Sequence, residues 1–156
     1  MATLPDTGLT HGGNPMAQRI ARPIHLAVAW LLVIGLLVQV FLAGMGVFSS
    51  ATEFATHRDV GYTLTLLPVV LIVTALVGGF GRWHAIAAAV MFAQFILQSI
   101  LVLQRDSMPA IAALHPVNGF VILLIAVWVA RDAWRAWQLS RESSPPERIA
   151  PESSTG

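Results

Sequence analysis

Histidine is the side chain in this sequence best suited to chemistry, because its ring nitrogens bind metals and exchange protons near neutral pH. The chain has five histidines and no cysteine. The lack of cysteine excludes disulfides, thiolate metal sites, iron–sulfur clusters and covalent c-type haem attachment. His11 lies in a polar segment and is expected to be solvated. The other four lie in or beside long apolar segments, so they are the candidates for a site.

These four histidines belong to an internal repeat. The pattern H-x13-Q-x17-H-x3-G is followed by H-x13-Q-x16-H-x3-G. Its members are His25, Gln39, His57 and Gly61 in the first unit, and His84, Gln98, His115 and Gly119 in the second. Fourteen helical residues fall about 40° short of four turns, so each leading histidine shares a helix face with its glutamine, about 21 Å along the axis. The repeat predicts two helical hairpins of similar design.

The repeat also predicts two histidine pairs at different depths. The inner pair, His25 and His84, begins the first helix of each hairpin on one side of the membrane. The outer pair, His57 and His115, lies on the first turn of each returning helix, near the two glutamines. Polar side chains at membrane depth usually face the bundle interior. The glutamines either hydrogen-bond between helices as packing contacts or line the same cavity as the outer pair.

The outer pair is suited to axial ligation of a haem iron, because imidazole is a good axial ligand and each hairpin supplies one. Gly61 and Gly119, one turn after each ligand, would let a macrocycle approach the backbone. Arg58 and Arg105 are candidate partners for its propionates. We therefore predict a b-type haem bound through the outer pair, with the glycines, arginines and glutamines in supporting positions.

Several interpretations of the inner pair stay open. Each of its histidines lies close to an arginine, Arg22 or Arg82, as is typical of polar residues at a membrane interface. A second haem there would carry electrons across the membrane, and a proton relay is another possibility. A zinc site is disfavoured, because four protein ligands at one depth are not evident.

Long apolar segments must position these residues. The chain is 56% hydrophobic and 11% charged, whereas a soluble domain carries about 25% charged residues. Four segments are long enough to span a bilayer, at residues 24–48, 57–77, 84–103 and 111–130, the last with an amphipathic extension to 137. Their short connections require antiparallel neighbours. The predicted fold is therefore an all-α integral membrane up-down-up-down four-helix bundle over residues 23–137, flanked by disordered tails at 1–22 and 138–156.

The arginines predict the orientation of this bundle. Six of them fall on one side, at positions 19, 22, 82, 131, 135 and 141, and the sequence contains no lysine. The other side has only Arg58 and Arg105, each next to an aspartate. The positive-inside rule therefore places both termini in the cytoplasm of a bacterial cell, with the outer pair toward the outer surface.

Three segments of the sequence resemble a known protein family. They are Q-V-F-L-A-G from Gln39, His57-x3-Gly61, and L-H-P-V-N-G from Leu114. They resemble a bacterial four-helix membrane family of unassigned function, over about residues 20–137. More distantly, the layout is similar to one half of haem A synthase and to other bis-histidine b-type membrane cytochromes. The resemblance implies that His57 and His115 are axial ligands of a b-type haem.

The sequence departs from haem A synthase in two respects. It contains one four-helix half, and Glu53 lies four residues before His57, where the enzyme's acidic residue lies three before. Catalytic oxidation of a haem methyl group is therefore disfavoured, and no catalytic residues are predicted. An electron carrier, a sensor or a subunit of a redox complex fits better.

Two other functions remain as alternatives to a haem-binding redox protein. The first is an accessory or assembly protein without a cofactor, and the second is an enzyme of haem maturation. The expected partners are the lipid bilayer, other membrane redox subunits or a second copy of the chain. Nucleic acid is not expected, because no basic run is long enough to follow phosphates.

Overall fold

The computed structural model describes residues 14–142, and helices account for nearly all of them. In chain order they are α1 (Pro15–Phe48), the 3-10 helix η1 (Ala51–Glu53), α2 (Phe54–Leu64), α3 (Leu66–Gly78), α4 (Arg82–Leu103), α5 (Pro109–Ala112) and α6 (Leu114–Glu142). The predictions for residues 1–13 and 143–156, including His11, lie outside the described residues.

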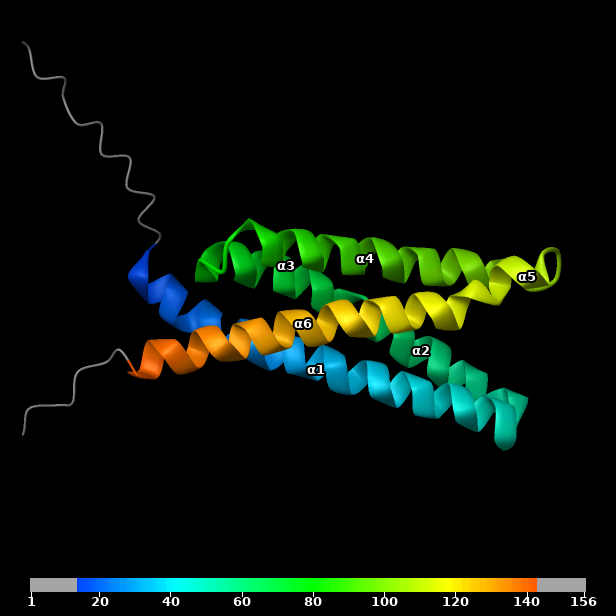
Figure 1. Ribbon diagram of the computed structural model, residues 1–156. Helices are drawn as coiled ribbons and strands as arrows, with labels where there is room; N and C mark the ends of the chain where they lie inside the picture. The colour runs from blue at the N-terminus through cyan, green and yellow to red at the C-terminus, as the bar shows by residue number, and fades with distance from the viewer. Residues whose placement is uncertain (1–13, 143–156) are drawn as a thin grey trace, which may run out of the picture.

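The four helices long and apolar enough to cross a membrane are α1, the run from η1 through α3, α4, and the run from α5 through α6. They form an antiparallel bundle, with α1 packed on α3 and α6, and α4 packed on the same two helices (Figure 1). No strand occurs within residues 14–142. The predicted all-α four-helix membrane bundle is confirmed.

Two helices are longer than the sequence predicts. α1 begins at Pro15 rather than at residue 24, because the Asn14 side chain accepts a hydrogen bond from the Met16 amide (3.0 Å) and Pro15 occupies the first turn, where it is tolerated. Residues 15–22, predicted as part of a disordered tail, are therefore helical. At the other terminus α6 continues to Glu142 rather than to 137.

The second membrane span is interrupted at Thr65, between α2 and α3. Pro68 explains the position, because a proline has no amide hydrogen to donate to the carbonyl four residues earlier, here that of Leu64. The Thr65 hydroxyl donates instead to the Gly61 carbonyl (3.1 Å) and stabilises the break. The break separates α2, which bears His57, from the rest of the span.

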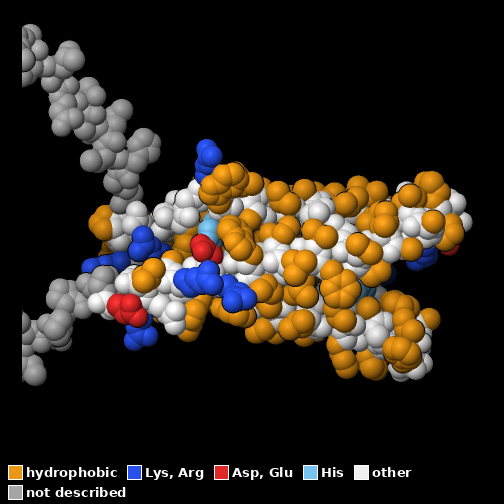
Figure 2. Space-filling view, in the orientation of Figure 1, with side chains coloured by type: hydrophobic (Ala, Val, Ile, Leu, Met, Phe, Trp, Pro, Cys, Tyr) orange, Lys and Arg blue, Asp and Glu red, His pale blue; other side chains and the backbone are white. Residues whose placement is uncertain are grey.

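Apolar side chains lie both between the helices and on the outside of the bundle. Residues buried at the centre include Leu32, Leu71, Met91, Ile122 and Val129. Many large apolar side chains are exposed along the whole length of the helices, as Figure 2 shows in orange. In water such a surface would aggregate, whereas in a bilayer it contacts lipid.

The two ends of the bundle differ in how closely the hairpins approach. At the terminal end, which carries Pro15 and Glu142, α1, α3, α4 and α6 pack together. At the loop end, which carries η1 and α5, α2 approaches α1, η1 and α3 but, among the described residues, none of α4, α5 and α6. Figure 2 shows the hairpins ending there in two separate lobes. The bundle is closed at one end and open between the hairpins at the other.

Candidate functional site

The outer pair lies where the two hairpins separate. His57 is on the first turn of α2 and His115 on the first turn of α6, and both are partly buried. Their ring centroids are 6.0 Å apart, and the ring planes are inclined by 62°. The structure therefore brings together the two histidines that the repeat places at one depth, although no close backbone contact joins their helices.

Each histidine of the outer pair is fixed by the preceding helix of its own hairpin. His57 Nδ1 donates to the Gln39 carbonyl (3.1 Å), and His115 Nδ1 donates to the Gln98 carbonyl (3.2 Å). A carbonyl only accepts, so Nδ1 carries the hydrogen in both neutral rings and Nε2 has a free lone pair. No hydrogen bond to either Nε2 occurs among residues 14–142. Both rings thus present an unoccupied metal-binding nitrogen.

The two glycines of the repeat lie against the glutamine amides. A Cβ added to Gly61 would be 3.4 Å from Gln39 Nε2, and one added to Gly119 would be 3.2 Å from Gln98 Nε2. The neighbour that the structure records for each glycine is therefore a glutamine, in the place where the sequence predicts a macrocycle. Each unit of the repeat uses its glutamine twice, through the carbonyl for the histidine and through the amide against the glycine.

The amides of the two glutamines have different partners. Asn118 Nδ2 donates to Gln98 Oε1 (3.0 Å) and to the Gln94 carbonyl (3.0 Å). The equivalent position in the first hairpin, three residues after its histidine, is Val60. Gln39 is only 8% exposed, and neither atom of its amide has a hydrogen-bond partner within the described residues. A buried amide without partners costs roughly 1–3 kcal/mol, so this position calls for a ligand group or water.

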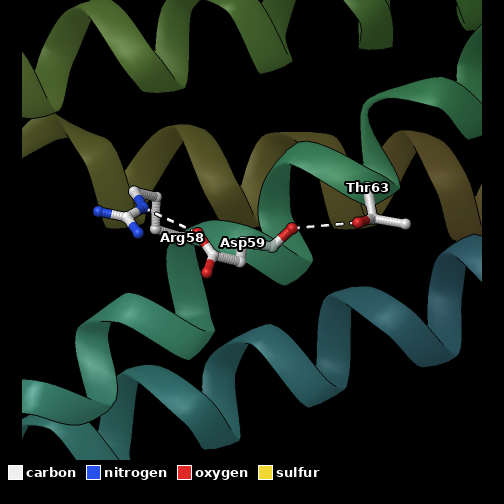
Figure 3. A network of polar contacts seen from close by, with 3 residues as sticks. All are labelled: Arg58, Asp59 and Thr63. Atoms are coloured by element: carbon white, nitrogen blue, oxygen red, sulfur yellow. Dashed lines mark hydrogen bonds and ion pairs between the residues drawn. The ribbon is translucent and has the colours of Figure 1, made fainter.

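The two arginines predicted beside the site lie on the surface. Arg58 pairs with Asp59 (2.9 Å), and Arg105 lies 3.6 Å from Asp106, all four side chains being exposed. Figure 3 shows the first pair on α2, with the Asp59 carbonyl accepting from the Thr63 hydroxyl. The structure records no contact of either arginine with the outer pair.

The inner pair is bonded directly, ring to ring. His25 Nε2 lies 3.0 Å from His84 Nδ1, and both side chains are buried. The second nitrogen of His25 lies 2.9 Å from Thr74 Oγ1, and that of His84 lies 2.9 Å from Asp132 Oδ2. We call these four residues the inner chain; they come from α3, α1, α4 and α6 in that order. The hydrogen bonds join all four helices at the terminal end.

Aromatic rings enclose the inner pair. Phe80 stacks on His25 (4.3 Å between centroids) and on His84 (5.1 Å), and Trp128 lies 5.5 Å from His84. Every ring nitrogen of the inner pair already has a partner, so none is free for a metal. Within residues 14–142 no group of three or more histidines and carboxylates is arranged to hold a metal ion. A second haem at the inner pair would have to replace these hydrogen bonds.

Sequence reasoning missed three polar residues that complete these sites. Thr74 follows His57 by 17 residues, and Asp132 follows His115 by the same interval. The repeat, extended by one more position, would therefore have pointed to both as equivalent partners of the inner pair. Asn118 has no counterpart in the first hairpin, so only its polarity within an apolar segment could have marked it.

One comparison with known proteins found a family to which part of the chain is similar. A model described as "Family of unknown function (DUF6220)" matches residues 39–105. The matched stretch runs from Gln39 to Arg105 and includes His57, His84 and Gln98. The search of curated proteins found no match, and neither did the search of solved structures. The chain is thus similar to a family whose function is unknown, and its likeness to haem A synthase remains a prediction.

Proposed function

We propose that this membrane protein binds one b-type haem between its two hairpins, with His57 and His115 as the axial ligands of the iron. The spacing of the outer pair carries the proposal. A metal–imidazole bond is about 2 Å long, so two imidazoles on opposite sides of one metal ion have centroids about 6 Å apart. The outer pair is 6.0 Å apart.

The hydrogen bonds of the outer pair support the same role. Histidines that ligate metals usually donate their other ring hydrogen to a carbonyl or carboxylate, which orients the ring and makes the ligating nitrogen more basic. His57 and His115 each make this bond, to the Gln39 and Gln98 carbonyls. The nitrogen left free in both rings is Nε2, the one farther from the backbone.

The divergence of the hairpins at the loop end supports a ligand between α2 and α6. α2 and α6 supply the two ligands and have no close backbone contact with each other within the described residues. A macrocycle between them would separate the hairpins where they already diverge (Figure 1). The Gln39 amide, buried and without a partner, gives such a ligand a polar group to satisfy.

A bare metal ion fits the outer pair less well. A structural zinc ion needs about four protein ligands, whereas this site offers two imidazoles. A haem supplies four equatorial nitrogens of its own, so two histidines complete its coordination. Six-coordinate iron has no position open for a substrate, and the chemistry that the group supplies when bound is one-electron transfer. The protein would then act as an electron carrier or as a subunit of a membrane redox complex.

The proposal is tested by spectra of the full-length protein purified from haem-replete cells. We expect a reduced-minus-oxidised spectrum of a b-type haem, with about one haem per chain. His57→Ala and His115→Ala should each abolish it. His25→Gln and His84→Gln are the matched controls, because they alter the equivalent residues of the inner pair and should keep the spectrum. A wild-type protein without haem would favour the accessory or assembly role instead.

We also propose that both termini lie in the cytoplasm, on the basis of the arginine distribution. The absence of cysteine allows a direct test, since any single introduced cysteine is the only thiol. In intact cells, a membrane-impermeant maleimide should label Ser107→Cys, at the loop end, and should leave Gln138→Cys, at the terminal end, unlabelled. If Gln138→Cys alone is labelled, the protein has the opposite orientation, with both termini outside the cytoplasm.

A further inference from the structure

The hydrogen bonds of the inner chain have a direction of donation, which the Thr74 hydroxyl indicates. Thr74 Oγ1 lies 2.8 Å from the Val70 carbonyl, one turn earlier in α3, and 2.9 Å from His25 Nδ1. A hydroxyl has one hydrogen and a carbonyl can only accept. If the hydroxyl donates to Val70, as threonines in helices commonly do to the preceding turn, its oxygen must accept from His25. His25 Nδ1 then carries a hydrogen.

Counting hydrogens along the rest of the chain gives one more than neutral rings provide. The contact of Thr74 with His25, the contact of His25 with His84, and the contact of His84 with Asp132 each need one hydrogen. Two neutral imidazoles carry two hydrogens in all, and a carboxylate carries none. The third hydrogen is an additional proton, whichever of the three groups holds it.

A second arrangement of hydrogens fits the same heavy atoms. If the Thr74 hydroxyl turns toward His25 Nδ1, His25 donates through Nε2 to His84, and His84 donates through Nε2 to the Asp132 carboxylate. Two ring hydrogens then suffice, and the only bond lost is the one to the Val70 carbonyl. The two arrangements of the inner chain therefore differ by one proton and share the same heavy-atom positions.

Net charge favours the protonated arrangement. With the additional proton, the two imidazoles and the carboxylate are neutral as a set, whereas without it they carry one negative charge beside buried rings. Burial disfavours net charge. The charged groups nearby are arginines: Arg22 on α1, Arg82 on α4, and Arg131 and Arg135 on α6; α3 has none. Arg22 donates to the Gly78 carbonyl (3.0 Å), and Arg82 lies over the Trp83 ring.

Only one end of the inner chain reaches the surface of the protein. The Asp132 side chain is 49% exposed, while His25, His84 and Thr74 are buried. Asp132 borders a cavity of about 290 Å³, lined also by Arg22, Phe80 and Trp137. Beyond Thr74 the bundle interior is apolar, with Leu71 and Met91 buried next along the axis. A proton from outside the bundle can therefore reach the inner chain at Asp132 and not at Thr74.

From this geometry we infer that the inner chain is a proton-binding site open only at the terminal end, which stores one exchangeable proton. A hydronium ion gives up its proton at the Asp132 carboxylate and leaves as water, and no electron is transferred. An imidazole cannot pass a hydrogen directly from one of its nitrogens to the other, so each of the two buried rings turns over to carry the proton inward. The Thr74 hydroxyl then turns to the Val70 carbonyl. This function concerns only the terminal end and does not depend on haem at the outer pair.

The decisive observable is the hydrogen on His25 Nδ1, which only the protonated arrangement contains. It can be measured by nitrogen-15 NMR of the full-length, histidine-labelled protein in lipid nanodiscs. We expect His25 Nδ1 to be protonated at neutral pH and to lose its hydrogen reversibly as the pH is raised. A bare Nδ1 at every pH would overturn the proposal. So would a hydrogen that never leaves, because the chain would then be a fixed structural link.

Two variants of Thr74 form a matched test. Thr74→Ser keeps the hydroxyl and should keep the wild-type pattern. Thr74→Val has nearly the same shape but no acceptor, so His25 Nδ1 should be bare at neutral pH. Asp132→Asn should have the same effect from the other end of the chain, since the extra proton would leave the set with a positive charge. His57 and His115 serve as internal references, with Nδ1 protonated in every variant. A wild-type pattern in Thr74→Val would contradict the proposal.

Discussion

The inner and outer histidine pairs occupy equivalent positions in one repeat, yet their surroundings are opposite. The inner rings are hydrogen-bonded to each other, and all their nitrogens have partners. The outer rings are 6.0 Å apart, and each has a free Nε2. The difference arises because the hairpins pack together at the terminal end and separate at the loop end. Equivalent residues thus form a closed hydrogen-bonded chain in one place and an open ligand site in the other.

Some equivalent positions of the two repeat units hold different residues, and these increase the difference between the inner and outer pairs. Thr74 and Asp132 are equivalent in sequence, but only the aspartate can carry charge, so the inner chain has one ionisable end. Val60 and Asn118 are equivalent as well, and only the asparagine satisfies its glutamine. A duplication made the two hairpins alike, and these positions give each pair its own chemistry. The following predictions test that division of roles.

The largest expected effect is on the stability of the inner pair. His84→Leu removes two hydrogen bonds and leaves His25 Nε2 and the Asp132 carboxylate without their partner. The buried His25 Nε2 costs roughly 1–3 kcal/mol when left unpaired, and the half-exposed Asp132 adds about 1 kcal/mol or less, so we expect a loss of about 1–4 kcal/mol. His57→Leu, at a partly buried site with one such bond, should cost about 1 kcal/mol. Denaturant unfolding in detergent, without added haem, checks the contrast, and equal losses would contradict it.

The next largest expected effect on stability comes from the different surroundings of the two glutamine amides, of which only that of Gln98 has a partner within the described residues. Asn118→Val should destabilise the protein by roughly 1–3 kcal/mol, because Gln98 Oε1 and the Gln94 carbonyl lose their donor. The reciprocal Val60→Asn should give Gln39 a partner and recover about 1 kcal/mol. The same unfolding assay measures both. If Gln39 serves the bound haem, Val60→Asn should also weaken haem binding, whereas an unchanged affinity would remove Gln39 from the site.

A smaller effect distinguishes two roles of Gly61 and Gly119, which are contact with the glutamine amides and contact with a macrocycle. Alanine at Gly61 or Gly119 would meet a glutamine amide at 3.4 or 3.2 Å, so the side chain must shift slightly. Alanine also favours a helix over glycine by about 1 kcal/mol, and the net change in stability should be below about 1 kcal/mol. Haem content is the sharper readout. Full haem occupancy in both variants would show that the glycines accommodate the glutamines and not the macrocycle.

The smallest expected change in stability is at Arg58. Its ion pair with Asp59 is exposed, and exposed pairs contribute little. Arg58→Gln should therefore unfold like the wild type. If Arg58 reaches a haem propionate, the variant should nevertheless bind haem more weakly, as a haem titration of the apoprotein would show. Arg105, also paired with a neighbouring aspartate at the loop end, is the second candidate, and Arg105→Gln should behave in the same way.

Much of the fold followed from the sequence, because hydropathy, loop length and the repeat all act locally. Four spans in antiparallel order needed only the apolar segments and their short connections. Two boundaries were wrong, at Pro15 and Glu142, because helix capping and an amphipathic extension continue helices beyond the apolar stretch. The break at Thr65 depends on a proline three residues later. Its effect on the direction of α2 depends on packing.

The site was less accessible to sequence reasoning. The repeat placed His57 beside His115 and His25 beside His84, since equal spacing gives equal depth. It gave no information on the angle between the hairpins, and that angle decides whether two rings touch or stand apart. The partners Thr74 and Asp132 lie about 50 residues from the histidines they bind. Such contacts arise only when the helices are assembled.

The separation of α2 from α6 also bears on how the holoprotein would be assembled. The two lobes separate at the side of the bundle, so a hydrophobic ligand dissolved in the bilayer would reach the site sideways, without crossing the bundle. At the closed terminal end, the packed helices hold the two hairpins together before any ligand arrives. Insertion of the chain into the membrane and binding of its ligand can therefore occur at different times. In the interval, the hydrogen bonds of the inner chain would keep the two hairpins of the ligand-free protein together.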